Sequence, residues 1–323
     1  MNEKLDGNQK KSKSNFNLIS FIMDYHAVVI FLILLIISAS LSPMFLSKQN
    51  IFNIFRQQTT YILVSIGVLL TILTGGLDLS VSSIAGVGSI VVAIALTNWG
   101  LGLIPAIILS IIVGALIGGF NGFCVSILKM PAVIVTLATW ISVEGLAYYI
   151  TNGAPIRLHT RENAASATLV DFGQGFGKLF GLPLVFYVPI FFLILFYLIM
   201  RYTSFGRLVK ATGSNQKAVR LAGINVKKYT FSVYVISGVL SAIAGIIVSS
   251  QTSIATAMTC STDFNLTAVA ACVIGGASLQ GGKGNIPFTL IGVFIIALIT
   301  NIMNLLSIPA YPQMIVKGLI IIF

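Results

Sequence analysis

The chain has 323 residues, of which 57% are hydrophobic and only 8% are charged. A soluble globular domain carries about 25% charged residues, so this composition excludes an ordinary water-soluble fold. Long unbroken apolar runs, such as 27–41 and 188–200, also argue against a membrane β-barrel, whose strands alternate apolar and polar residues. The sequence therefore predicts an all-α protein, a polytopic bundle of transmembrane helices.

The apolar segments set the expected number of crossings. A spanning helix needs about 20 mostly apolar residues, so the chain has room for about ten spans with short loops. We expect a cytoplasmic tail over 1–26 and one transmembrane domain over 27–323. The predicted spans are 27–46, 61–75, 80–97, 101–128, 132–150, 183–200, 231–250, 264–280, 287–307 and 313–323.

The net charge of +11 is concentrated in a few segments. The polar stretch 201–229 holds seven Lys and Arg and no acidic residue, and the tail carries four lysines. Short loops rich in Lys and Arg stay cytoplasmic. With the N-terminus inside, Lys129 follows four crossings, residue 201 follows six and Lys283 follows eight. All of these segments then lie inside, so the basic excess indicates topology and not nucleic-acid binding.

Three segments fit the ten-span scheme less simply. The longest outside loop is 151–182. Segment 251–263 is polar and is predicted to be either a loop or a re-entrant piece. The last apolar segment would cross only about half of the hydrocarbon core, so we expect a truncated last helix.

Small residues recur at helical spacing in two predicted spans. Residues four apart let helix backbones approach closely. We favour tight packing within one subunit over a dimer seam, which is the alternative. The two sets are Gly114, Gly118 and Gly122, and Ser237, Ser241 and Gly245.

A polar break interrupts the apolar pattern at 75–80. Asp78 and Ser80 follow the pair Gly75–Gly76. The carboxylate can cap the start of the next helix by accepting backbone N–H groups. The alternative is a place in the translocation pathway, because Gly-interrupted spans in transporters often line the substrate path. A second pair, Gly275–Gly276, lies two hundred residues later and hints at two related halves.

Polar side chains inside the spans are further pathway candidates. A charge at the centre of a bilayer costs at least about 2.5 kcal/mol, so Glu144 should face protein or water. A structural hydrogen bond and a pathway role are both open for it. For the amides, interhelical hydrogen bonding is favoured over a pathway role. These amides are Asn121, Asn301 and Asn304.

The chain lacks the motifs of an enzyme. Segment 277–284 resembles a phosphate loop, but it has Ala277 where glycine is needed and Gly284 where Ser or Thr would bind Mg²⁺. Cys124, Cys260 and Cys272 have no metal-ligand spacing, so we assign neither a metal nor a disulfide. We expect no cofactor on this chain, and ATP and Mg²⁺ would be used by a partner.

The basic stretch contains a short amphipathic segment at 215–223, which Gly223 should end. A helix lying on anionic lipid headgroups and a docking knob for a cytoplasmic subunit both fit this pattern. Composition does not choose between them.

Several motifs, taken together and in order, resemble the membrane permease of bacterial monosaccharide ABC importers of the ribose type. The resemblance runs from about residue 40 to the end. The motifs are GGLDLS at 75–80, TNGAP at 151–155, GSNQKAVRLAGINV at 213–226, VIGGASLQGGKG at 273–284 and YPQMIVK at 311–317.

The resemblance implies a permease in the bacterial cytoplasmic membrane, paired with a second permease subunit. An extracytoplasmic sugar-binding protein would dock outside and a tandem ATPase inside, the latter on the loop 201–230. The residues that carry over to this docking are Asn215, Ala218, Arg220, Leu221 and Gly223. The family often has a basic residue before the glycine that matches Gly145, and this chain has Glu144 there.

The expected function is therefore ATP-driven import of a monosaccharide, ribose first. Within the class, another sugar or a sugar-like autoinducer is the alternative. From another class, an ion-coupled secondary transporter would use Glu144 for coupling. An intramembrane enzyme is disfavoured because paired catalytic groups are missing.

Overall fold

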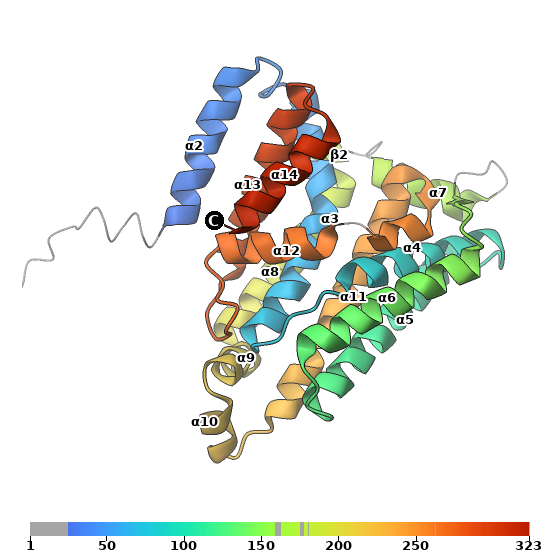
Figure 1. Cartoon of the computed structure of the whole chain (residues 1–323). Coiled ribbons are helices and arrows are strands. Elements are labelled where there is room, and N and C mark those ends of the chain that lie inside the picture. The colour runs from blue at the N-terminus through green and yellow to red at the C-terminus, as the bar shows by residue number, and fades with distance from the viewer. Residues whose placement is uncertain (1–24, 159–162, 175–177, 180, 262, 323) are drawn as a thin grey trace, which may run out of the picture.

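A computed structural model describes residues 25–158, 163–174, 178–179, 181–261 and 263–322. Nearly all of the predicted cytoplasmic tail lies outside these residues. The described chain is a bundle of helices with four two-residue strands (Figure 1). The helices are α2 (His26–Leu41), α3 (Lys48–Leu73), α4 (Val81–Thr97), α5 (Leu103–Ser126), α6 (Ala132–Thr151), α7 (Ala164–Gln174), η1 (Leu184–Phe186), α8 (Tyr187–Tyr202), α9 (Ser204–Ser214), α10 (Gln216–Leu221), α11 (Val226–Thr252), η2 (Ala257–Ser261), α12 (Phe264–Ile274), α13 (Ile286–Leu305) and α14 (Ala310–Ile322).

Helix α11 is the central element of the bundle. It packs against α3, α4 and α5, and most of its length is buried. The crossing with α5 depends on glycine: a Cβ on Gly114 would lie 2.6 Å from the carbonyl oxygen of Gly238, and Gly118 lies equally close to α11. On the other side, a Cβ on Gly245 would overlap the backbone of Ala85 in α4. The small residues therefore pack helices within one subunit, as favoured from the sequence.

Helix α3 begins earlier than predicted. The expected span 61–75 corresponds to only the second half of a helix that starts at Lys48. Residues 48–60 are rich in polar side chains, so hydropathy did not predict this part of the helix. Ser47 caps it by accepting the N–H of Asn50 at 3.2 Å, and buried Asn50 and Gln58 face the bundle. The helix forms because its polar residues find partners inside the protein.

The polar segment before α12 packs into the bundle through η2, so it is not an exposed loop. Cys260 in η2 is fully buried, and a Cβ on Gly86 in the middle of α4 would collide with it. Trp140 of α6 donates its indole N–H to the Cys260 carbonyl at 2.9 Å. Helix α12 then ends at Ile274 and not at 280, because Gly275 packs directly against the backbone of α13 and Gly276 adopts a φ of +81°.

The described residues of the predicted outside loop 151–182 form short strands and one helix. Strand β1 (Ile156–Arg157) pairs antiparallel with β4 (Ile254–Ala255), and β2 (Lys178–Leu179) pairs with β3 (Leu182–Pro183). Helix α7, which lies between β1 and β2 in the sequence, packs on the end of α11. There, a Cβ on Gly173 would collide with Ser250. The segment therefore covers one end of the bundle.

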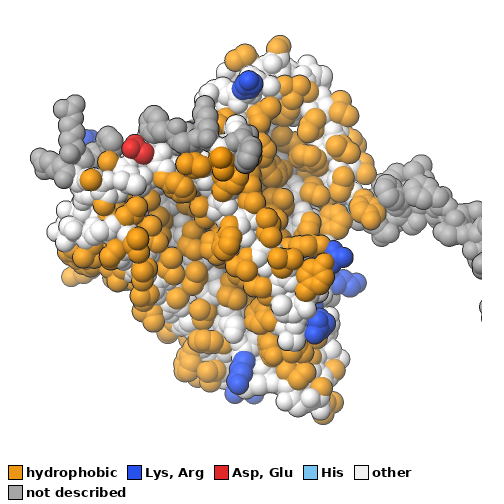
Figure 2. All heavy atoms as spheres, turned by 180° about the vertical axis from the view of Figure 1, so that it is seen from behind, with side chains coloured by type: hydrophobic (Ala, Val, Ile, Leu, Met, Phe, Trp, Pro, Cys, Tyr) orange, Lys and Arg blue, Asp and Glu red, His pale blue; other side chains and the backbone are white. Residues whose placement is uncertain are grey.

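The outer surface is apolar. Large hydrophobic side chains of α2, α5, α6 and α8 are exposed. Figure 2 shows hydrophobic side chains spread over the face that it presents. Among the described residues, six helices are long and apolar enough to cross a membrane, and α2 and α4 are shorter apolar helices. The predicted count of ten is not reached by this measure, because α3 is half polar and α14 has 13 residues.

The predicted basic segments meet at one end of the bundle, which we call the basic end. It comprises loop 127–131, the α9–α10 region and loop 275–285. Lys129, Arg220 and Lys227 line one cavity of about 300 Å³ there. The first residue of α2, His26, also lies at this end, beside Gly276. Segments far apart in sequence thus share one face, as the predicted topology requires.

Candidate coupling and translocation site

The break between α3 and α4 is held open by glycine. Gly75 has a φ of +80°, which favours a residue without a Cβ. At Gly76 a Cβ would overlap the hydroxyl of Tyr234, a fully buried side chain of α11. The helix therefore stops at Leu73, and 74–80 is a non-helical segment whose polar groups face neighbouring helices.

Asp78 is the centre of a buried hydrogen-bond network. Its Oδ1 accepts the Ser80 hydroxyl at 2.6 Å and the Ser80 N–H at 3.0 Å. Its Oδ2 accepts the Ser237 hydroxyl of α11 at 2.7 Å. The carboxyl group is completely buried and accepts every one of these bonds. The capping role is thus present, since Ser80 directly precedes α4, but a second helix also holds the carboxyl group.

The network continues through two more helices. Asn121 of α5 donates to the Ser80 hydroxyl at 2.8 Å, and Thr139 of α6 donates to the Asn121 oxygen at 2.6 Å. Each donor in this chain points towards Asp78, an arrangement in which successive bonds polarise one another. We call Asp78, Ser80, Asn121, Thr139 and Ser237 the Asp78 network. It joins α5, α6 and α11 to the break before α4.

Two further side chains fix the backbone of the break. The Thr136 hydroxyl of α6 is shared between the Leu77 carbonyl at 3.1 Å and the Ala132 carbonyl of its own helix at 2.9 Å. Asn265 of α12 donates to the Leu79 carbonyl at 3.2 Å. These carbonyls lack helical partners, and a buried carbonyl without a hydrogen bond is costly. The break is therefore held from four helices.

A second contact joins the break to the basic end. The carbonyl of Leu73 accepts the N–H of Gly282 at 3.0 Å, and a Cβ on Gly213 at the end of α9 would overlap that carbonyl. A Cβ on Gly281 would lie 2.9 Å from the Cα of Gly75. We call Gly75, Gly213, Gly281 and Gly282 the glycine junction. It brings three backbones together with no side chain between them.

Helix α10 projects from the basic end (Figure 1). Asn215 caps it by accepting the N–H of Ala218 at 3.0 Å, and Gly223 ends it with a φ of +77°. Only Val219 is buried, whereas Leu221 is 90% exposed. The predicted helix and both of its ends are confirmed. Leu221 lies between Arg220 and the turn at Ala222–Gly223, and it forms an exposed apolar tip.

Helix α9 was missed by the sequence reading. It starts with Thr203, whose hydroxyl accepts the N–H of Gly206 at 3.4 Å, and it connects α8 to α10. The Thr cap and the apolar spacing of Phe205, Leu208 and Val209 could have revealed it. Because Gly213 lies in the last turn of α9, this helix connects the projecting helix to the glycine junction.

The remaining pathway candidates lie apart from Asp78. Asn301 exchanges two amide hydrogen bonds with Asn50 of α3, at 2.8 and 3.0 Å, and Asn304 accepts from Gln313 of α14 at 2.8 Å. Glu144 is half-buried on α6, one turn after Trp140. Gly275 packs on α13, and Gly276 lies beside His26. The structure thus joins Asp78, Ser80 and Asn121 but not these residues.

Two polar contacts were not predicted from the sequence. Thr139 is one of three threonines in α6, and the sequence pattern gives no reason to single it out. The ion pair between Lys317 and Asp263, 2.9 Å apart, ties α14 to the start of α12 and is the one found among the described residues. Within those same residues, no group of three or more His, Cys, Asp or Glu side chains could hold a metal ion.

The apolar bundle, its internal polar network and its projecting helix define the class of protein: a polytopic membrane permease. Residues 50–323 match the family described as the permease component of branched-chain amino acid transport systems, and the chain belongs to this family. It is therefore a transport subunit and a multi-pass membrane protein.

Curated relatives cover nearly the whole chain. It is 36% identical to the ribose import permease protein of Haemophilus influenzae, over 97% of this chain and 95% of that protein. It is 38% identical to the Bacillus subtilis ribose import permease protein, over 90% and 88%. The L-arabinose transport system permease protein of Escherichia coli is 34% identical, over 96% and 92%. No solved structure matches the chain.

Proposed function

We propose that this chain is the membrane-spanning subunit of an ATP-driven importer for a monosaccharide, with ribose as the first candidate. The observation that carries the proposal is its similarity, along nearly its whole length, to permeases named for ribose import. Relatives named for L-arabinose and xylose make other pentoses the second candidates. A pentose is small and rich in hydroxyl groups, so the path it crosses needs hydrogen-bonding groups.

In this proposal α10 is the docking element for the ATPase, and the basic end faces the cytoplasm. The exposed Leu221 supports this role, because apolar side chains that anchor an interface lie open in the isolated subunit. The concentration of Lys and Arg at this end supports the orientation. Helix α10 projects from the bundle (Figure 1), where a cytoplasmic subunit can reach it.

The glycine junction would transmit the movement of the ATPase. When α10 and α9 shift, Gly213 presses on Leu73 and Gly282 without an intervening side chain that could rotate away. The break at 74–80 and the loop 275–284 then move together. ATP binding would thereby favour the outward-facing state, and hydrolysis would return the inward-facing one.

A second permease copy would complete the pathway. Helix α6 exposes much of its length, including Ile141 and Tyr149, and carries half-buried Glu144 within the membrane. An ionisable side chain there is costly against lipid, so this face suits a protein partner or a watery path. Outside, a sugar-binding protein would deliver the substrate to the end covered by α7.

The test is uptake of labelled ribose by cells that lack their own ribose permease but keep a working ribose-binding protein. The chain is supplied with and without the ATPase, and unlabelled arabinose and xylose are added as competitors. Saturable uptake that requires the ATPase supports the proposal. Uptake without the ATPase that an ionophore abolishes would replace it with ion-coupled transport. Stronger competition by another pentose would change the sugar but keep the class.

A variant tests the docking role separately. Gly223→Arg puts a large cation on a backbone position with a φ of +77°, where a Cβ meets open space. We expect normal insertion but loss of ATPase-dependent uptake. Wild-type uptake in this variant would contradict docking at α10.

A further inference from the structure

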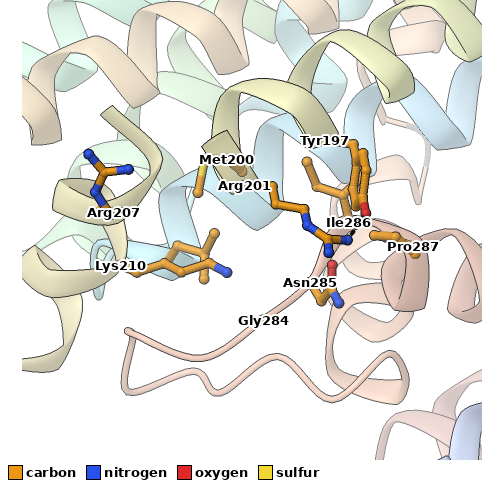
Figure 3. A pocket seen from close by; sticks show the side chains of 10 residues that line it. Tyr197, Met200, Arg201, Arg207, Lys210, Gly284, Asn285, Ile286 and Pro287 are labelled. Atoms are coloured by element: carbon orange, nitrogen blue, oxygen red, sulfur yellow. Dashed lines mark hydrogen bonds between the residues drawn. The ribbon is translucent and has the colours of Figure 1, made fainter. Parts of the chain in front are cut away.

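A cavity of about 420 Å³ opens at the basic end, between the end of α8, helix α9 and the start of α13. Figure 3 shows Arg201 and Lys210 reaching towards the segment Gly284–Asn285 from two different helices. Arg207 and Tyr197 also line it. This cavity is separate from the Asp78 network and from the exposed tip of α10.

The cavity is strongly cationic. Three basic side chains line it and no acidic residue does. Within the part of the chain that the structure describes, the one ion pair is between Lys317 and Asp263, so carboxylates do not neutralise these cations. An anion is therefore the ligand that the cavity would take.

The position of Arg201 favours a phosphate group. Its guanidinium binds the Tyr197 hydroxyl and lies 5.6 Å and 5.5 Å from the ring centres of Tyr197 and Tyr202. These contacts hold the planar group in place while other N–H donors stay available, and a guanidinium binds phosphate oxygens in pairs. Lys210, which is half-buried, adds a point charge from the facing helix.

The surroundings of the cavity favour a lipid over a free anion. Arg201 ends α8, whose preceding turns expose Ile194 and Leu198. Ile194 and Leu198 lie seven and three positions before Arg201, so they share its face of α8. A phosphate in the cavity would thus sit at the end of an apolar helix surface along which acyl chains can lie. Basic pockets between transmembrane helices bind anionic headgroups in this way.

We propose that this cavity is a binding site for the phosphate of an anionic phospholipid, held by Arg201 and Lys210 with Arg207 nearby. The proposal needs the chain to span a membrane, which the family shows, but it does not depend on the transported sugar. A bound headgroup here would contact α9 and so stiffen the connection between the bundle and α10.

The test is native mass spectrometry of the purified full-length permease in detergent, titrated with phosphatidylglycerol or phosphatidylcholine. We expect one phosphatidylglycerol per chain to bind tightly, and phosphatidylcholine to bind weakly. Removing two cations in R201Q/K210Q should weaken this first binding event about thirtyfold. The control K228Q/K283Q removes the same charge from exposed lysines outside the cavity and should bind like the wild type.

Two further arms make the result decisive. The charge-preserving variant R201K/K210R should retain phosphatidylglycerol, which separates lost charge from lost folding. If R201Q/K210Q does not fold, K210Q alone replaces it, with a smaller weakening expected. Equal weakening in K228Q/K283Q, or equal binding of both lipids, would overturn the proposal. Displacement of the lipid by millimolar inorganic phosphate would also overturn it, in favour of a soluble anion site.

Discussion

The Asp78 network and helix α10 are both polar regions in an apolar protein, but the polar groups of the first are buried and those of the second are exposed. Around Asp78, each acceptor meets a donor, either from neighbouring Ser80 or from another helix, and the side chains are buried. In α10 nearly every side chain is exposed, and its contacts with the rest of the chain are few. The difference teaches that the first region maintains the bundle, whereas the second is open for a partner.

The largest expected effect comes from the helix crossing that supports the network. Gly114→Ala would place a Cβ 2.5 Å from that of Ala242 and 2.6 Å from the Gly238 carbonyl oxygen. We expect a loss of about 3 kcal/mol in the free energy of unfolding, since neither backbone can move aside. Reversible unfolding in mixed micelles measures it.

Gly119→Ala is the matched control for this crossing. Its nearest neighbours would lie at 3.8 Å, and alanine favours the helix by up to about 1 kcal/mol over glycine. A Gly114→Ala variant as stable as Gly119→Ala would contradict the close approach of α5 and α11.

The next effect concerns the network itself. Ser237→Ala removes one of the donors to Asp78 in a fully buried site, and we expect a cost of about 2 kcal/mol in stability. Ser241→Ala is the control, because that equally buried hydroxyl donates to the Ser237 carbonyl within its own helix. Equal stability of the two variants in the same unfolding measurement would show that Asp78 does not depend on α11.

A smaller effect, and one on transport alone, is expected at the exposed tip. Leu221→Ser should lower ATPase-dependent uptake at least about tenfold by removing an apolar anchor from the interface. Stability should not change, because Leu221 is 90% exposed. The control is Leu101→Ser, an exposed leucine between α4 and α5. A similar loss of uptake in both variants would argue against α10 as the docking element.

The smallest effect is expected at the amide pair between α3 and α13, outside the Asp78 network. Asn301→Ala breaks the reciprocal amide pair with Asn50, and hydrogen bonds between transmembrane helices average about 0.6 kcal/mol. We expect uptake to persist with a slightly less stable protein. Lost uptake at unchanged stability would instead make Asn301 a residue of the pathway.

The elements predicted best are those with a local signal. Helix α10 was expected from its spacing and its final glycine, and α4 and α6 begin and end within a residue of the predicted spans. Helix α3 was predicted too short, because Asn50 and Gln58 look unfavourable until their burial is known. Helix α12 was predicted too long, because hydropathy does not register that Gly275 must contact α13.

The candidate site was predicted in part. Asp78 and Ser80 stood out as polar residues beside a glycine pair, and Asn121 as an amide in an apolar span. Ser237 was noticed only as a small residue that lets helices approach. Its role as a donor to Asp78 spans 159 positions of sequence, and no local pattern encodes such a pairing.

The sequence by itself determined that this protein spans a membrane. It also determined the positions of most helices along the chain and which loops lie on the same side. These properties follow from hydrophobicity and charge, which each segment carries alone. Only the tertiary structure decided which polar groups meet and which small residues separate helices. Those outcomes depend on the crossing of α5 and α11 and on the closeness of Gly75, Gly213 and Gly282, where the missing side chains let distant backbones touch.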